Sequence, residues 1–291
     1  MKVFFDITNR CNASCLYCFT NSNKEGYENE LCLDEIISLI DNLVKNDISK
    51  LSIAGGEPFL REIDKIMRYC NGKIDLSLTT NGTILNDKIV KSLKETKTKL
   101  TISIDSLNQD IVDKVRKGID IEKVINNIKK LCDISEIRDR LSLRTTVSTL
   151  NIDHVEELIE FSNKLKIKKL KINSTNPFGR ALNNLDLIPN FWEFESKYKK
   201  LEDYIKCNSD VTKVEIPVMK YLAKKDKQCL LGKNSIYINS KGDVFPCAFS
   251  NNRLAVGNIK NDPINELIQK CNHFDKNNDI CKNCEIHRYE K

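Results

Sequence analysis

Six apolar stretches rich in β-branched residues, each followed by a stretch of helical periodicity, occupy the first two thirds of this 291-residue sequence. The alternation predicts strand–helix units stacked around a parallel sheet. Six units are too few for a closed eight-unit barrel, so we expect an α/β fold built on a partial (β/α)6 TIM-type barrel. The strands are predicted at residues 3–7, 50–54, 75–80, 100–105, 141–147 and 167–172.

The chain changes character after residue 173, where the regular alternation stops. A loop rich in Asn and Pro comes first, and a helix is expected over residues 191–205. Residues 235–239 and 243–245 then predict a hairpin that turns at Lys241-Gly242, followed by a short helix over 263–270. We therefore divide the chain into a barrel (1–180), a linker with a helix (181–225) and a small hairpin-and-helix domain (226–291).

The charge and the N-terminus narrow the class of partner. The 47 Lys and Arg against 41 Asp and Glu give a net charge of +6 at pH 7, which is small for a dedicated nucleic-acid binder. The first residues lack the apolar segment of an export signal, and no stretch is long and apolar enough to span a bilayer. We expect a cytoplasmic protein with no membrane partner and no nucleic-acid partner.

Twelve cysteines are unusually many for such a protein, and five of them crowd into the last quarter of the chain. In a secreted protein they would form disulfides. Here there is no export signal, and the chain is long enough to fold without cross-links. The cysteines therefore favour metal or redox chemistry.

Three of the cysteines, Cys11, Cys15 and Cys18, lie within eight residues on the loop predicted after the first strand. This spacing directs three sulfurs to one place. A four-iron cluster can be held by three thiolates, which leaves one iron open for chemistry. The alternative is a zinc site, which would need a distant fourth cysteine to complete its tetrahedron.

This C-x3-C-x2-C pattern, with Tyr17 before its last cysteine, resembles the signature of the radical SAM enzymes. Gly55, Gly56, Glu57 and Pro58, which follow the second strand, are similar to the GGEP element of that family. The resemblance implies a [4Fe–4S] cluster on the three cysteines and bound S-adenosylmethionine (SAM). It also implies that the backbone and carboxylate of the GGEP element hold the amino group of the SAM methionine.

Further matches follow in the order that the family has them. They are Asn81 after the third strand, Ser103 and Asp105 on the fourth, Arg116 downstream of it, and Arg144 on the fifth. The resemblance implies that these residues contact SAM, with an arginine as the partner of its carboxylate. Without the resemblance, any one of them could be an ordinary strand or surface residue.

The C-terminal cysteines form a second pattern, in which Cys229 and Cys247 flank a glycine and Cys281 and Cys284 follow. This pattern is similar to the SPASM and twitch domains of radical SAM enzymes. The resemblance implies one auxiliary [4Fe–4S] cluster held by the four cysteines, in the shorter twitch form. A zinc ribbon on the same four residues is the alternative. Cys271 lies between them and is interpreted as an ordinary thiol.

Taken over the chain, the resemblance implies a radical SAM oxidoreductase with two [4Fe–4S] clusters. Such an enzyme cleaves SAM reductively to a 5′-deoxyadenosyl radical, which takes a hydrogen atom from the substrate, and a flavodoxin or ferredoxin supplies the electron. The architecture implies a ribosomal peptide or protein substrate that is oxidised, cross-linked or epimerised. Two alternatives stay open, a dehydrogenase for small-molecule alcohols in natural-product biosynthesis and a non-catalytic iron–sulfur electron carrier or sensor. The sequence assigns no catalytic acid, base or hydrogen donor.

Overall fold

The computed structural model describes residues 1–189, 191–208, 211–216, 232–248 and 254–274. A ten-stranded sheet runs through it in the order β12-β11-β10-β1-β3-β4-β5-β7-β8-β9. Its strands are β1 (Lys2–Asp6), β3 (Lys50–Ala54), β4 (Asp75–Thr80), β5 (Lys99–Ser103), β7 (Leu141–Val147), β8 (Lys169–Ser174), β9 (Lys213–Glu215), β10 (Ser235–Ile238), β11 (Asp243–Phe245) and β12 (Gly257–Asn258). A two-stranded sheet pairs β2 (Ser14–Cys15) with β6 (Arg116–Lys117).

The partial barrel consists of six parallel strands, β1, β3, β4, β5, β7 and β8. Each begins and ends within two residues of its predicted bounds. On β7 every second residue is buried, which is the pattern of a strand that packs one face against covering helices. The α/β fold class with a partial barrel is confirmed.

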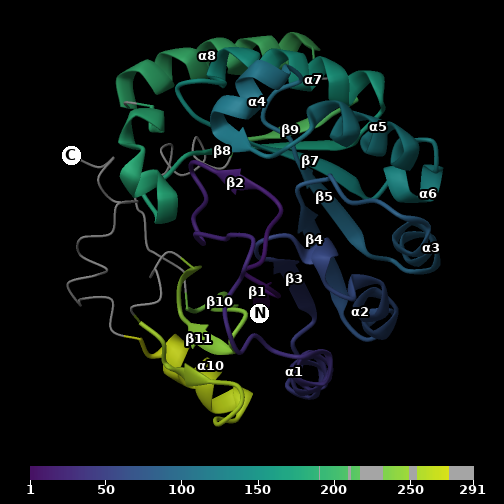
Figure 1. Cartoon of the computed structure of the whole chain (residues 1–291), viewed down its shortest axis with the longest axis vertical. Helices are drawn as coiled ribbons and strands as arrows, with labels where there is room; N and C mark the ends of the chain where they lie inside the picture. Colours follow the sequence, from purple (N-terminus) through teal and green to yellow (C-terminus); the bar gives the residue numbers. More distant parts are fainter. Residues whose placement is uncertain (190, 209–210, 217–231, 249–253, 275–291) are drawn as a thin grey trace.

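Helices lie along the outer side of the curved sheet (Figure 1). At the start of the first helix, the Glu35 carboxylate accepts a hydrogen bond of 2.8 Å from the backbone N of Cys32. This helix buries the apolar stripe from Ile36 to Leu43 against the sheet. The α-helices are α1 (Leu33–Lys45), α2 (Ile63–Cys70), α3 (Asp87–Glu95), α4 (Gln109–Val115), α5 (Ile121–Cys132), α6 (Ser135–Arg138), α7 (Val155–Lys164), α8 (Phe191–Asn208) and α10 (Ile264–Asn272). Short 3-10 helices are η1 (Pro58–Leu60), η2 (Ile152–His154), η3 (Gly179–Asn183) and η4 (Leu185–Leu187).

The sheet continues past both ends of the barrel. β9 adds to β8, and β10 adds to β1 with Lys2 opposite Ser235, both in parallel. β11 and β12 then follow in antiparallel order, which confirms the predicted hairpin, and α10 confirms the helix after it. The hairpin therefore shares one sheet with the barrel. The domain bounds at residues 180 and 225 stay a prediction.

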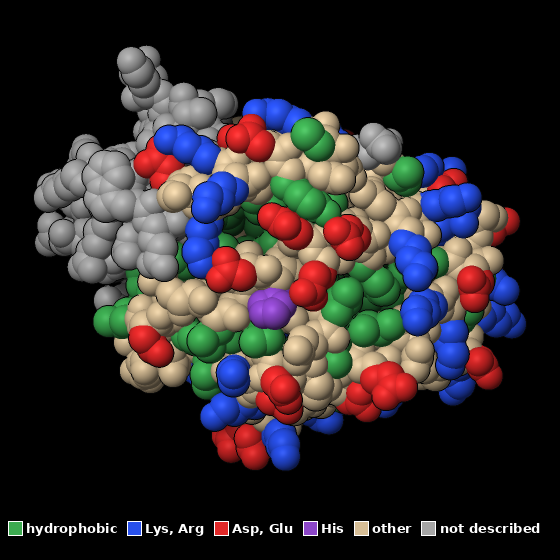
Figure 2. All heavy atoms as spheres, turned by 90° about the horizontal axis from the view of Figure 1, so that it is seen from above, with side chains coloured by type: hydrophobic (Ala, Val, Ile, Leu, Met, Phe, Trp, Pro, Cys, Tyr) green, Lys and Arg blue, Asp and Glu red, His purple; other side chains and the backbone are tan. Residues whose placement is uncertain are grey.

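Acidic and basic side chains alternate, between apolar patches, over the face seen from above (Figure 2). Opposite charges pair between α8 and η2, with Lys197 2.8 Å from Asp153, and within α8, with Lys199 3.2 Å from Glu195. Within the described ranges, no helix has the length and apolar character needed to cross a membrane.

Candidate functional site

The loop that follows β1 carries Cys11, Cys15 and Cys18. Cys15 pairs with Arg116 in the β2–β6 ladder, and the backbone N of Cys18 donates to the Cys15 carbonyl at 3.2 Å. The thiol-bearing side chain of Cys11 is buried, and the other two are half-buried. The sequence thus folds all three thiols onto one short, anchored loop at the carboxyl end of β1, the end at which parallel barrels place their chemistry.

A distant segment, η3, holds this loop in place. The backbone N of Arg180 donates to the Cys18 carbonyl at 2.9 Å, its Nε to the Cys15 carbonyl at 2.7 Å and its Nη1 to the Ser22 carbonyl at 2.7 Å. Gly179 has a φ of +57°, and a Cβ there would lie 2.3 Å from the Cys18 carbonyl oxygen. Only glycine permits this approach without a shift of the backbone. The sequence alone does not assign this anchoring role to Arg180, because a guanidinium that binds backbone carbonyls selects no partner side chain.

The loop that carries Cys11, Cys15 and Cys18, called the cysteine loop below, fits a four-iron cluster. Burial raises the pKa of Cys11 to about 11, and the nearby charges of Cys15 and Cys18 add to the rise. Burial also raises the pKa of Cys15, and the positive charge of Arg116 opposes this rise. The thiols are thus close enough to influence one another. In the described part of the chain, no three His, Cys, Asp or Glu side chains converge on a position for a single ion, whereas a cluster spans a larger volume.

The turn Gly55-Gly56-Glu57-Pro58 after β3 packs directly on the cysteine loop. The backbone N of Glu57 donates to the Arg10 carbonyl at 2.8 Å, and a Cβ on Gly56 would lie only 2.1 Å from that carbonyl oxygen. Gly55 has a φ of +122°, and Pro58 opens η1. Glycine is therefore required where the two loops meet.

The carboxylate of Glu57 is fully buried and accepts three hydrogen bonds. Oε1 accepts from Thr80 Oγ1 at 2.6 Å and from the backbone N of Phe59 at 3.0 Å, and Oε2 accepts from the backbone N of Asn81 at 2.7 Å. Burial raises the pKa of Glu57, and these donors oppose the rise. The carboxylate therefore fixes the ends of β3 and β4 together, and the surrounding backbone faces the cysteine loop.

Asn81 joins the loop after β4 to the cysteine loop. Its Nδ2 donates to Asn12 Oδ1 at 2.8 Å, and its Oδ1 accepts from the backbone N of Thr83 at 2.9 Å. Asn12 in turn donates to Thr83 Oγ1 at 2.8 Å. Asn12 lies between the cysteines, yet the sequence analysis did not single it out, because the cysteine pattern leaves that position open.

Asp105, two residues beyond β5, is a buried acceptor beneath the cysteine loop. The hydroxyl of Tyr17 donates to its Oδ2, and the backbone N of Thr146 donates to its Oδ1 at 2.9 Å. Burial raises the pKa of Tyr17 well above its usual value, so the hydroxyl keeps its proton and stays a donor. Tyr17 is thereby locked to the barrel, just before the last cysteine.

Arg116 places a buried positive charge against the cysteine loop. Its Nε lies 3.8 Å from Asp105 Oδ2, its Nη1 donates to the Ser103 carbonyl at 2.5 Å, and its side chain contacts the thiol of Cys15. A cation in this position stabilises the thiolate form of a cysteine.

Ser103 and Arg144 lie side by side, in register on β5 and β7, and both are half-buried. With the amide of Asn173 oriented so that its oxygen faces Arg144, Oδ1 accepts from Nη2 at 2.9 Å and from Nε at 2.5 Å. Burial lowers the pKa of Arg144. Because its paired partner is a neutral amide, the guanidinium remains suited to an additional carboxylate.

The structure describes one of the four C-terminal cysteines of the second pattern. Cys247 follows β11 and is half-buried, whereas Cys229, Cys281 and Cys284 lie outside the described residues. Cys271 is buried on α10, and burial raises its pKa to about 12, as expected for a thiol in apolar surroundings.

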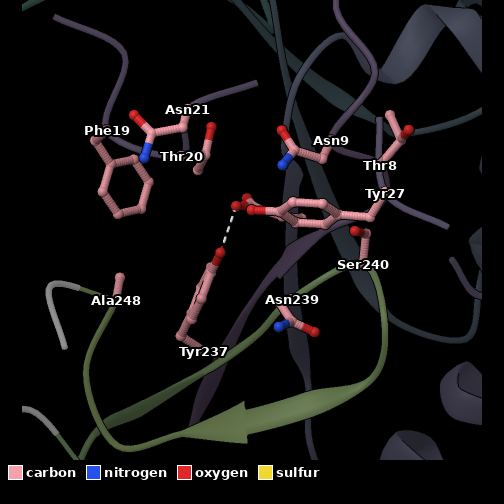
Figure 3. Close-up of a pocket in the computed structure, with 11 residues that line it drawn as sticks. Thr8, Asn9, Phe19, Thr20, Asn21, Tyr27, Tyr237, Asn239, Ser240 and Ala248 are labelled. Atoms are coloured by element: carbon pink, nitrogen blue, oxygen red, sulfur yellow. Dashed lines mark hydrogen bonds between the residues drawn. The ribbon is translucent and has the colours of Figure 1, made fainter. Parts of the chain in front are cut away.

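One cavity lies between the cysteine loop and the hairpin (Figure 3). Phe19 and Ala248 both line it, and they are the immediate neighbours of Cys18 and Cys247. The rings of Phe19 and Tyr237 meet edge to face, with centroids 6.4 Å apart. The two cysteine-bearing segments therefore border the same space.

Residues 5–162 match the sequence profile of the radical SAM superfamily, and residues 229–285 match that of the SPASM iron–sulfur cluster-binding domain. The chain belongs to the radical SAM superfamily. It is an enzyme that uses SAM and two [4Fe–4S] clusters, so the resemblance and the cofactors expected from the sequence are confirmed.

Among the curated relatives, GTP 3′,8-cyclase of Clostridium botulinum is 26% identical over 289 residues, covering 91% of this chain and 86% of that protein. The subtilosin biosynthesis protein AlbA of Bacillus subtilis is 28% identical over 266 residues, covering 89% of this chain and 57% of AlbA. Among solved structures, Streptococcus suis SuiB bound to the precursor peptide SuiA shares the fold, with a TM-score of 0.77, 17% identity and coverage of 98% of this chain and 69% of SuiB.

Proposed function

We propose that this enzyme modifies a peptide or protein, by oxidation, cross-linking or epimerisation of one of its residues. The observation that carries the proposal is the cavity bordered by Phe19 and Ala248, because a substrate that places one small group there lies beside both cysteine-bearing segments. AlbA, a protein of bacteriocin biosynthesis, and SuiB, solved with a precursor peptide, are relatives whose names support a peptide substrate.

In this proposal each metal site has its own cysteines, Cys11, Cys15 and Cys18 for the first cluster and Cys229, Cys247, Cys281 and Cys284 for the second. When bound, SAM and its reduced cluster supply a 5′-deoxyadenosyl radical that takes a hydrogen atom from the substrate. We place the enzyme in the cytoplasm, with flavodoxin or ferredoxin as the reductant.

The chain's own residues divide the work of binding SAM. The backbone of Gly55 and Gly56 receives the ammonium group of SAM, since Glu57 already accepts three protein hydrogen bonds and, with Pro58 in η1, fixes the turn. Arg144 receives the SAM carboxylate, beside Ser103. The remaining residues predicted to contact SAM anchor the cysteine loop and lie on the side of it that faces the barrel. They are Tyr17, Asn81, Asp105 and Arg116.

The same cavity gives no support to an anionic substrate such as a nucleoside triphosphate. None of the described residues that line it is Lys, Arg or His, and it contains the carboxyl group of Asp6. Lys241 Nζ lies 4.7 Å from the centre of the Tyr27 ring but is not among the lining residues. A phosphate would therefore meet negative charge without a cationic partner.

The test is hydrogen transfer from labelled cell extracts. Cells of the source organism are grown on deuterated medium, and their extract is separated into a peptide fraction and a small-molecule fraction. Each fraction is incubated with the reconstituted enzyme, SAM and a reductant, and deuterium in 5′-deoxyadenosine is measured by mass spectrometry. We expect label from the peptide fraction only, and none with the Cys15→Ala variant. Label from the small-molecule fraction alone would favour the alcohol dehydrogenase, and label from neither fraction would reject both substrate classes.

A further inference from the structure

The cavity between the cysteine loop and the hairpin contains polar groups that lack partners. Asn9, at the start of the cysteine loop, is 3% exposed, and neither its Oδ1 nor its Nδ2 finds a hydrogen-bond partner in the described part of the chain. Ser240, in the hairpin turn, is 1% exposed, and its Oγ is likewise without a partner there. Both side chains line the cavity, and Figure 3 shows the Asn9 amide directed into it.

Such groups are costly to bury. An unpaired buried donor or acceptor destabilises the fold compared with one that is paired, because it gives up hydrogen bonds to water and gains none. Three unpaired atoms on two elements that face one cavity are therefore better explained by an occupant than by packing. Buried polar residues elsewhere in the chain serve as a contrast, since Asn127 donates from Nδ2 to the Gly82 carbonyl at 2.9 Å and Ser162 donates to the Leu158 carbonyl at 2.7 Å.

The size of the cavity limits what can enter. It encloses about 40 Å³, and a single water needs roughly 10–15 Å³ on that scale. The space therefore holds a few waters or one small planar group, not a whole peptide residue with a bulky side chain.

The chemistry of the walls narrows the occupant further. Asn9 offers one donor group and one acceptor, a pair that matches the carbonyl and N–H of an amide. Asp6 and Tyr237 close the other side, where the Tyr237 hydroxyl donates to Asp6 Oδ2 at 2.5 Å and leaves the second carboxyl oxygen as a further acceptor. The aromatic rings of Phe19, Tyr27 and Tyr237 supply flat surfaces for a planar group.

We propose that this cavity is a recognition site for one neutral amide group of the substrate, which pairs with the side chain of Asn9 and is completed by Ser240. The proposal rests on the proposed function insofar as the amide belongs to a peptide. It deepens that function by assigning Asn9 and Ser240 as residues that position the substrate beside the cysteine loop.

The test uses the reconstituted holoenzyme labelled with 3-fluorotyrosine and follows the fluorine resonance of Tyr237, which is assigned by its loss in Tyr237→Phe. N-methylacetamide serves as the probe for an amide, with acetate and methylammonium as charged probes of similar size. We expect N-methylacetamide to shift the Tyr237 resonance saturably and acetate to leave it unchanged. Asn9→Leu should weaken the binding about tenfold, the loss expected for roughly one buried hydrogen-bonded group, and Ser162→Ala should not change it.

Variant stability provides a second readout that does not depend on turnover. Because Asn9 has no partner to lose, Asn9→Leu should unfold at the same urea concentration as the wild type or a higher one, whereas Asn127→Leu should unfold earlier. If Asn9→Leu does not fold, Asn9 is a structural residue and Ser240→Ala carries the binding test.

The remaining outcomes separate this inference from the proposed function. A stronger response to acetate or methylammonium would make the cavity an ion site, and no response to any probe would leave it holding water only. Both results would overturn the proposal, even if the enzyme modifies peptides. Binding of N-methylacetamide with no label transfer from the peptide fraction would instead retain the amide site and reject the peptide substrate.

Discussion

Arg180 Nε donates a hydrogen bond of 2.7 Å to the carbonyl oxygen of Cys15, which lies 165 residues earlier in the chain. Together with the bond from Nη1 to the Ser22 carbonyl, it makes the guanidinium a rigid fork over the cysteine loop. The shape of the first cluster site is thus set by a residue from the far end of the barrel.

Replacing Arg180 by Lys should destabilise the protein by about 2 kcal/mol, because an ammonium cannot reach both carbonyls in the geometry of the fork. Urea unfolding measures the loss, and iron content after reconstitution should fall with it. Arg68→Lys is the control, since Arg68 pairs at the surface with Asp64 and Glu95 and should change stability by no more than about 0.5 kcal/mol. Equal losses in the two variants would show that the fork does not hold the loop.

Gly179→Ala should be much more harmful than Gly72→Ala. Both glycines have positive φ angles, so each substitution costs about 1 kcal/mol in backbone strain. A Cβ at Gly179 would also lie 2.3 Å from the Cys18 carbonyl oxygen, whereas nothing lies within 4 Å of one at Gly72. Thermal unfolding of both variants measures the difference, and similar melting temperatures would contradict the close approach of η3 to the cysteine loop.

Asp105→Asn should cost roughly 3 kcal/mol, since it leaves the buried charge of Arg116 without its carboxylate. SAM binding should weaken as well, because Tyr17 loses the carboxylate to which it donates and Arg116 loses its ion-pair partner. Asp75→Asn is the matched control, as Asp75 pairs with Lys99 at 2.7 Å in an exposed position and should contribute about 1 kcal/mol or less. Calorimetric titration with SAM and urea unfolding check the two effects separately.

Asp6 should make stability depend on pH. Burial raises its pKa from 3.8 to about 6, so the folded state holds this proton more tightly than the unfolded state does. The contribution of Asp6 to the free energy of unfolding is therefore fully present below about pH 4. It is lost as the pH rises to about 6, and the loss amounts to at most about 3 kcal/mol. Asp6→Asn, which stays neutral, should lack this decline, so its stability relative to the wild type should increase over that range. Urea unfolding at several pH values measures the difference, and parallel curves would rule out the shift.

Cys15→Ala should abolish SAM cleavage and lower the iron content from about eight to about four per chain, because one of two four-iron clusters is lost. Cys132→Ala is the control, since Cys132 is a buried thiol on α5 whose pKa burial raises to about 11. It should retain both activity and iron. A fall in iron to near zero in Cys15→Ala would mean that the C-terminal cysteines hold no cluster.

Much of the fold could be predicted from the sequence, because each of the six barrel strands is marked by a run of its own apolar residues. What could not be predicted is how β10 pairs. Its residues predict a strand and a turn, but the choice of β1 as its partner depends on the edge that the assembled barrel leaves open, which no local pattern encodes.

The candidate site divides in the same way. Cys11, Cys15 and Cys18 and the GGEP turn stand out because their spacing is itself the signal. The roles of Asn12, Asn173 and Arg180 could not be predicted, because each acts through backbone groups or through partners that are adjacent only after folding. Asn9 became visible only as a polar side chain without a partner.

The parallel pairing of β1 with β10 has a consequence for biosynthesis. β1 leaves the ribosome more than two hundred residues before its neighbour β10, as the 231-residue separation of Asp6 and Tyr237 illustrates. A nascent barrel therefore waits with one sheet edge open, and such an edge can pair with other chains. Expression at low temperature, or with chaperones that shield exposed strands, should improve the yield of soluble protein more than any change in the barrel itself.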